Sequence, residues 1–207
     1  MFHKPTNHFN ILFLEITTIT WILAFSASVI LGISKAGLKG IAIIIVTLMA
    51  LAFGAKESTG LIVPLLLVGD VFAVIYYNRH AQWKYILRFL PWMIFGLLIG
   101  VLIGNNLPER SFKFGMSAII LVSVLLMYWL DLRKSKSVRS HWAFGGFMGV
   151  LAGITTMIGN LAGAFSNIYF LAMRLPKNVF IGTAAWLFLI VNAIKLPFHI
   201  FVWKTIS

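Results

Sequence analysis

Long apolar runs constrain this chain more than any other feature. Four of them, at 58–77, 85–104, 112–130 and 179–200, are each long enough to cross the hydrocarbon of a bilayer as a helix, which takes about 20 residues. Of the 207 residues, 60% are hydrophobic and 11% are charged, whereas soluble domains carry about 25% charged residues. The sequence therefore predicts an all-α, polytopic transmembrane helical protein with the lipid bilayer as its surroundings.

The basic residues orient the chain rather than bind nucleic acid. The formal net charge is +12, but cations gather in short segments between the apolar runs, at 79–88 and at 133–139. Such an excess of Lys and Arg marks the cytoplasmic loops of membrane proteins. We therefore expect a multi-pass protein of the plasma membrane with both basic loops in the cytoplasm, and we expect no nucleic-acid partner.

Residues suited to catalysis or metal binding are scarce. The chain has no cysteine, five acidic residues, and five histidines without the spacing of metal ligands. Ser34 with Lys35 or Lys39 could imitate a serine–lysine pair, but adjacent residues of a helix point apart, so the indication is weak. The sequence therefore predicts no enzyme, no metal and no cofactor, and an intramembrane enzyme is the weaker alternative.

Two regions, 10–54 and 142–173, are interrupted by glycine-rich breaks. The first contains GISKAGLKG, which starts at Gly32, and the second contains GITTMIGNLAG, which starts at Gly153. The apolar pieces on either side of the second break are each about half a span. Backbone of this kind is tolerated at membrane depth only where protein or a water-filled cavity covers it. Each region is therefore predicted to be a broken helix or a re-entrant hairpin.

The two interrupted regions open two similar halves of the chain. The glycine breaks and the polar residues Asp70 and Asn192 recur in the same order, at an offset near 120–123 residues. If the second region is a hairpin, an odd number of crossings separates the copies, and the second copy is inverted, as in many secondary transporters. A single broken span would make the copies parallel and would put Arg174 and Lys177 on the face opposite to the other basic loops.

The expected organisation has three parts: a first repeat (1–130, with the interrupted pair 10–54 and the first three spans), a basic cytoplasmic linker (131–141) and a second, partial repeat (142–207, with the interrupted pair 142–173 and the span 179–200). The second repeat is expected to be incomplete, because it lacks about two helices that the first repeat has. Three alternatives stay open: a truncated chain, a naturally minimal one, or completion by another subunit, as in a homo-oligomer.

The motifs resemble those of a known transporter family. GISKAGLKG, LPWMIFGLLIGVLIGNNLPE at 90–109 and GITTMIGNLAGAF at 153–165 follow the order and spacing of the TauE/SafE family of sulfite exporters and sulfonate permeases, over roughly residues 25 to 200. The resemblance implies a small transporter with two repeats. It also implies that the substrate is sulfite, a sulfonate or a related sulfur oxyanion.

Both glycine breaks carry candidate ligands for a small anion. In the first break, the start of a new helix near Leu38 would offer unpaired N–H groups and a positive dipole end, to which lysines would add charge. The second break would add hydroxyl, amide and backbone donors. The predicted substrate-binding residues are Ser34, Lys35, Gly37, Lys39, Gly40, Thr155, Thr156, Gly159, Asn160 and Asn192. Alternatively, the lysines snorkel to an interface and the small and polar residues only pack helices.

Two further ionisable residues lie inside predicted spans. Asp70 is expected either to carry a coupled proton or to form an ion pair with Lys35 or Lys39, since a charge inside a membrane is a functional hypothesis by default. Lys195 lies within about two turns of a helix end and is expected to snorkel to the interface.

The sequence thus predicts a secondary transporter for a small sulfur-containing anion. The expected mechanism is alternating access around a site near the midplane, between the two repeats. The rival hypothesis is a non-transporting membrane assembly subunit, which the expected incompleteness of the second repeat leaves open.

Overall fold

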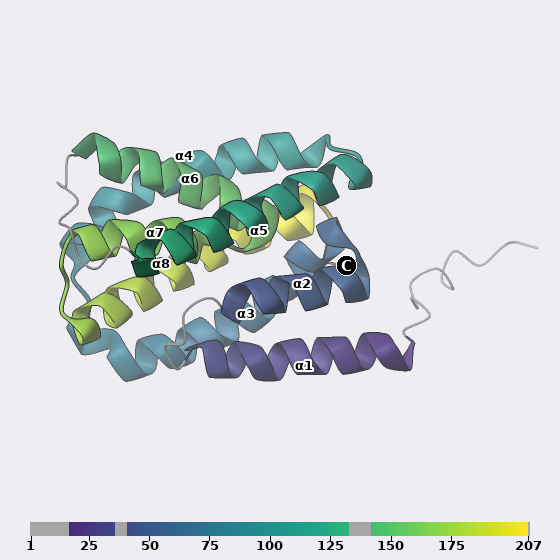
Figure 1. The fold of residues 1–207 in the computed structure, drawn as a ribbon, viewed down its shortest axis with the longest axis horizontal. Helices are drawn as coiled ribbons and strands as arrows, with labels where there is room; N and C mark the ends of the chain where they lie inside the picture. Colours follow the sequence, from purple (N-terminus) through teal and green to yellow (C-terminus); the bar gives the residue numbers. More distant parts are fainter. Residues whose placement is uncertain (1–16, 36–40, 133–141, 207) are drawn as a thin grey trace, which may run out of the picture.

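The fold consists of helices throughout residues 17–35, 41–132 and 142–206, the parts that the computed structural model describes (Figure 1). The α-helices are α1 (Thr18–Lys35), α2 (Ile41–Phe53), α3 (Ala55–Tyr77), α4 (Trp83–Asn105), α5 (Glu109–Leu132), α6 (Trp142–Gly159), α7 (Ala162–Ala172) and α8 (Lys177–Pro197). A 3₁₀ turn, η2 (Asn78–His80), precedes α4, and a π-helical turn, η3 (Phe198–Val202), follows α8. Four described segments, within α3, α4 and α5 and across α8 with η3, are long and apolar enough to span a bilayer. The predicted all-α, polytopic membrane fold is confirmed.

The α2–α3 and α4–α5 junctions lie together at one end of the bundle. Gly54 separates α2 from α3 with a φ of 92°, a left-handed conformation that glycine adopts without steric cost. The amide of Ala55, the first residue of α3, donates a hydrogen bond of 2.9 Å to Oε1 of Glu109, the first residue of α5. A helix start leaves N–H groups without partners, and the carboxylate of Glu109 supplies one for the start of α3. The bond thereby joins the starts of α3 and α5.

The start of α8 packs on the α3–α4 junction at the other end. A Cβ on Gly182 would lie 2.5 Å from the carbonyl oxygen of Tyr77, so this position of α8 touches backbone directly. One residue further on, Thr183 Oγ1 accepts a hydrogen bond of 3.0 Å from the amide of Gln82. α8 therefore begins at the end of the bundle where α3 finishes.

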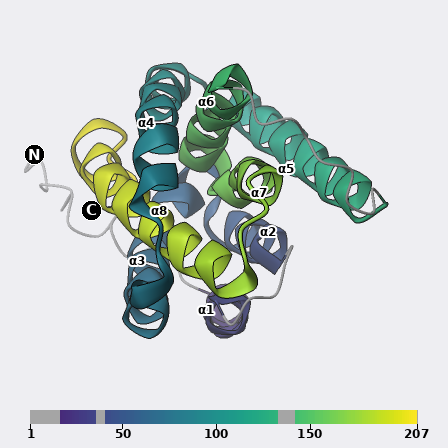
Figure 2. The same ribbon diagram turned by 90° about the vertical axis from the view of Figure 1, so that its left-hand side faces the viewer.

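Two helix pairs, α1–α2 and α6–α7, form hairpins that open at opposite ends of the bundle. α2 finishes beside the α4–α5 junction, whereas α7 finishes shortly before α8 starts at the α3–α4 junction. In Figure 1 the α1–α2 pair opens to the right and the α6–α7 pair to the left, and Figure 2 shows the same helices turned by 90°. All four helices belong to the shorter apolar helices of the fold.

Glycines let α4 and α6 approach more closely than side chains would allow. A Cβ on Gly153 of α6 would lie 2.0 Å from the carbonyl oxygen of Met93, and a Cβ on Gly96 of α4 would lie 2.1 Å from that of Val150. Small residues are favoured at such contacts because lipid tails supply no hydrophobic force between helices, so association depends on close packing. The α4–α6 pair is therefore a closely packed support for the α6–α7 hairpin.

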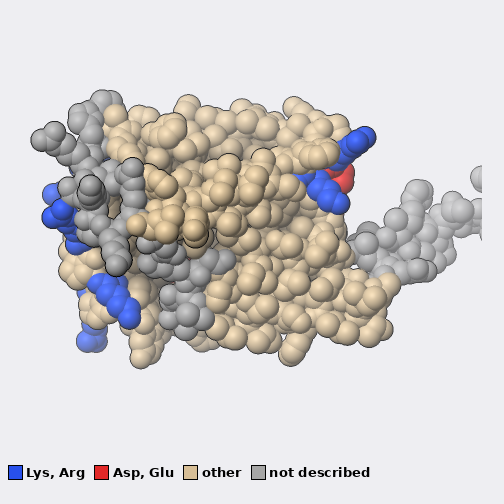
Figure 3. All heavy atoms as spheres, viewed as in Figure 1, with Lys and Arg blue, Asp and Glu red and all other residues tan. Residues whose placement is uncertain are grey.

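Exposed charges lie at the two ends of the bundle. Figure 3 shows Lys and Arg near both ends of the visible face, with an uncharged band between them. The end where α8 starts, here named the basic end, carries these exposed cations: Arg79, Lys84, Arg88, Arg174 and Lys177. The opposite end, at the α4–α5 junction, exposes charges of both signs, including Glu109, Arg110 and Lys113. An uncharged band between charged ends is the pattern of a bundle embedded in a bilayer.

Candidate functional site

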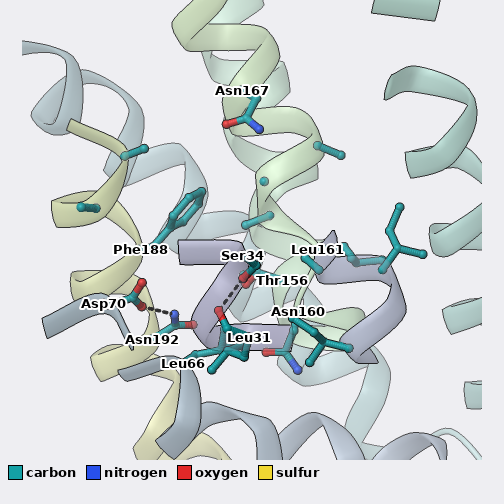
Figure 4. A pocket seen from close by; sticks show the side chains of 18 of the residues that line it. Leu31, Ser34, Leu66, Asp70, Thr156, Asn160, Leu161, Asn167, Phe188 and Asn192 are labelled. Atoms are coloured by element: carbon teal, nitrogen blue, oxygen red, sulfur yellow. Dashed lines mark hydrogen bonds between the residues drawn. The ribbon is translucent and has the colours of Figure 1, made fainter. Parts of the chain in front are cut away.

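A cavity of about 320 Å³ lies where the two hairpins meet α3, α5 and α8. Its wall is largely apolar, with Leu31, Leu66 and Phe188 among the lining residues. Polar side chains from four helices gather in one part of it, as Figure 4 shows for Ser34, Asp70, Thr156, Asn160 and Asn192. A small apolar chamber with a few convergent polar groups is the usual form of a ligand site.

The cavity extends to the basic end, and a buried tryptophan packs at the opposite end of the bundle. Lys177, the exposed first residue of α8, also lines the cavity. At the opposite end the chain after η3 folds into the bundle, where Trp203 is buried and its Nε1 donates a hydrogen bond of 3.1 Å to the carbonyl oxygen of Val101. The same indole packs edge-on against Phe112, with 5.6 Å between ring centroids. The contacts of Trp203 thus fill the end of the bundle opposite to Lys177.

Lys195 of α8 is a buried cation directly behind the polar part of the wall. Its side chain is 0% exposed. Its Nζ donates hydrogen bonds to three oxygens: Thr156 Oγ1 at 3.4 Å, Asn192 Oδ1 at 3.4 Å, and Asn160 Oδ1. The expectation that Lys195 snorkels to the interface is wrong, because these oxygens supply the polar partners that a buried ammonium needs. All three partners line the cavity.

The contacts of Lys195 orient two amides in the wall. An amide presents an oxygen acceptor on one side and two N–H donors on the other, so Lys195 turns the nitrogens of Asn160 and Asn192 away from itself. Nδ2 of Asn160 donates to the carbonyl oxygen of Thr59 at 3.0 Å, and Nδ2 of Asn192 donates to Oδ2 of Asp70 at 2.7 Å. Each bond uses one of the two hydrogens of the amide nitrogen. The second hydrogen can donate a hydrogen bond to a bound oxyanion.

Asn160 also makes the turn between α6 and α7. Its φ is 54°, in the left-handed region that asparagine tolerates better than most residues. The glycine before it, Gly159, has ordinary room for a side chain, since the nearest contact of an added Cβ would be 3.6 Å. The chain reversal thus depends on Asn160, whose side chain also ties the hairpin tip to Thr59 of α3 and Lys195 of α8.

Five of the predicted functional residues lie together in the cavity wall: Ser34, Asp70, Thr156, Asn160 and Asn192. The hydroxyl of Ser34 donates to the carbonyl oxygen of Leu31 at 2.8 Å. Thr155 lies elsewhere in α6, where its hydroxyl donates to the carbonyl oxygen of Leu151 at 2.8 Å, and Gly159 ends that helix. The remaining candidates, Gly37, Lys39 and Gly40, and the side chain of Lys35, fall outside the described residues. Their roles, and an ion pair of Asp70 with either lysine, stay predictions.

Lys195 is the site residue that sequence reasoning missed. Asn192, Lys195 and His199 follow one another at spacings of three and four residues, which places them on one face of a helix. All three are buried, so this polar face of an otherwise apolar helix was the available signal. Two further polar residues line the cavity, Ser123 of α5 and Asn167, which follows Ser166 in α7. Neither has polar residues at helical spacing that would have indicated a site.

The comparison with protein families gives one match. Residues 21–206 match the family described as Sulfite exporter TauE/SafE. The matched region contains the α1–α2 hairpin from residue 21 on, the whole α6–α7 hairpin, all four spans and every residue named above in the cavity wall. Comparisons with curated proteins and with solved structures give no match. Since the match extends over nearly the whole chain and the fold is that of a helical membrane protein, the chain belongs to the sulfite exporter TauE/SafE family, a family of membrane transporters.

Proposed function

We propose that this chain carries sulfite or an organosulfonate across the membrane, with the cavity between the hairpins as the substrate site. The observation that carries the proposal is the set of bonds made by Lys195, which occupy the acceptor oxygens of Asn160, Asn192 and Thr156. The oxygens of a sulfur oxyanion accept hydrogen bonds, and hydrogen bonds to charged groups are the stronger ones. A wall that offers N–H donors in front of a buried cation therefore suits such an anion.

Two further features support a sulfur anion. The family to which the chain belongs is named for sulfite export. The larger apolar part of the cavity wall, with residues such as Leu66 and Phe188, would accommodate the organic group of a sulfonate, while the polar part receives the sulfur oxygens.

The placement of the hairpins supports an inverted repeat. The α1–α2 and α6–α7 pairs open at opposite ends, and each is followed by a long span, α3 or α8. Asp70 and Asn192, 122 residues apart, occupy matching places in these spans and are hydrogen-bonded to each other. In this proposal α1–α3 and α6–α8 are the two copies, and movement of one against the other exposes the cavity alternately to the two sides.

The basic end faces the cytoplasm in this proposal, as the excess of cations there favours. Because the chain contains no cysteine, single cysteines can test the orientation without background. Gln82 and Asn106 are exposed positions at the basic and the opposite end, respectively. A membrane-impermeant maleimide should label Asn106→Cys on intact cells, and Gln82→Cys only after the membrane is opened. The reverse pattern would place the basic end outside.

Flux through the purified protein in proteoliposomes tests the transport function itself. Sulfite labelled with ³⁵S, or taurine as a sulfonate, should enter at a saturable rate well above that of empty liposomes, and sulfate should serve as the comparison oxyanion. A larger flux of taurine than of sulfite would indicate that the site also recognises the organic group of a sulfonate. Absence of flux for all three solutes would contradict the proposal and favour the assembly-subunit hypothesis.

A further inference from the structure

Asp70 is the acidic side chain at the substrate cavity. It is 1% exposed, lies in the middle of α3 and lines the cavity. The other two acidic side chains that the structure describes, Glu57 and Glu109, are exposed at the opposite end of the bundle. A carboxylate in the wall of an anion site is costly, because a like charge in a low-dielectric interior repels the substrate.

The amide of Asn192 connects Asp70 to the buried cation. Nδ2 of Asn192 donates to Oδ2 of Asp70 at 2.7 Å, and Oδ1 of the same amide accepts from Nζ of Lys195 at 3.4 Å. In the described structure the negative charge of Asp70 therefore balances the positive charge of Lys195 through Asn192. A bound anion would be a second negative charge for the same cation.

Few of the helices packed around Asp70 carry charged groups near it. From α8 they are Lys195 and Lys177, which lines the same cavity as Asp70, and from η3 it is His199, one turn beyond Lys195. From α6 the facing groups are Thr156 and Asn160, which are uncharged, and α2 contains no ionisable residue. The acidic and basic residues on the other neighbours lie at helix ends: Glu109, Arg110, Lys113 and Asp131 on α5, the last with its side chain outside the described residues, and Arg79 and His80 in η2. Lys35 ends α1, and its side chain lies outside the described residues.

We infer that Asp70 takes up one proton when the anion binds, so that the substrate is carried together with that proton. This inference rests on the proposed substrate site. The carboxylate accepts a proton from solution and becomes a neutral acid, so that the bound anion takes its place as a counter-charge of Lys195. The neutral acid keeps a carbonyl oxygen that still accepts from Nδ2 of Asn192, so the amide oxygen stays on Lys195.

Linkage between pH and affinity tests the inference. The probe is methanesulfonate, a strong acid's anion that does not titrate near neutral pH, and binding is measured by calorimetry on the purified full chain. Above the pH at which Asp70 titrates, the dissociation constant of the wild type should rise about tenfold per pH unit, as uptake of one proton requires. In Asp70→Asn the affinity should be independent of pH, while the control Glu109→Gln should keep the wild-type slope.

A second measurement needs no variant. In weakly buffered solution with a pH indicator, saturation of the wild type with methanesulfonate should remove about one proton per bound anion. A pH-independent wild-type affinity, or a wild-type slope in Asp70→Asn, would overturn the role of Asp70 and leave the substrate site standing. Failure of the wild type to bind methanesulfonate, taurine or sulfite at any pH would overturn the substrate site as well.

Discussion

Lys195→Met should reduce sulfite or sulfonate binding about a hundredfold or more, because truncating one partner of a buried, hydrogen-bonded charge typically costs that much affinity or more. Methionine fills a similar volume but carries no charge and no N–H donor. Without Nζ the oxygens of Asn160 and Asn192 lose their fixed partner, and the amides are free to turn acceptors toward the cavity. Calorimetry with methanesulfonate and ³⁵S-sulfite flux in proteoliposomes measure the loss.

Two variants separate a role in binding from a role in folding. Lys113→Met removes the same charge from an exposed position on α5 and should leave flux unchanged. Lys195→Met combined with Asp70→Asn removes both buried charges, so this double variant should fold and run as a single peak in size-exclusion chromatography, yet still fail to bind the anion. If the double variant transports at the wild-type rate, Lys195 serves only to balance Asp70, and its role at the substrate site is contradicted.

The membrane fold could be predicted from sequence because apolar run length decides it. About 20 apolar residues suffice for a helix to cross the hydrocarbon, and the four predicted runs correspond to the four spans of the structure. The glycine-rich breaks likewise indicated where regular spanning helices stop. In the second break, however, the turn residue is Asn160, with its φ of 54°, rather than a glycine. A sequence pattern of glycines does not reveal which residue adopts the left-handed conformation.

The candidate site was only partly accessible to sequence reasoning, because burial depends on partners from distant segments. Thr156 and Asn160 were predicted from the break itself, and Asn192 and Asp70 from the repeat offset. Lys195 was misplaced because its distance from the helix end suggested an interfacial position. What decides its burial is a set of oxygens that includes Thr156, 39 residues away, and Asn160, 35 residues away. No local spacing rule contains that information.

A glycine that contacts backbone should tolerate substitution far less than a glycine beside open space, and α6 and α5 provide the pair for this comparison. An added Cβ on Gly153 would meet the carbonyl oxygen of Met93 at 2.0 Å and the amide nitrogen of Leu97 at 2.5 Å. Both are backbone atoms, which cannot rotate aside, so Gly153→Ala must push α4 and α6 apart. Overpacking of this kind costs about 1–3 kcal/mol, which corresponds to an apparent melting temperature lower by about 2–12 °C.

Gly115 of α5 is the matched control, because an added Cβ there has no neighbour within 4 Å. Alanine is favoured over glycine within a helix by about 1 kcal/mol, so Gly115→Ala should keep or slightly raise the melting temperature. The two substitutions are chemically identical and are expected to act with opposite sign. Fluorescence-detected thermal unfolding in detergent measures both, with size-exclusion chromatography to follow aggregation. Equal melting temperatures for the two variants would mean that α4 and α6 are not held at backbone contact, and the α6–α7 hairpin would then lack the rigid support on which the position of Asn160 depends.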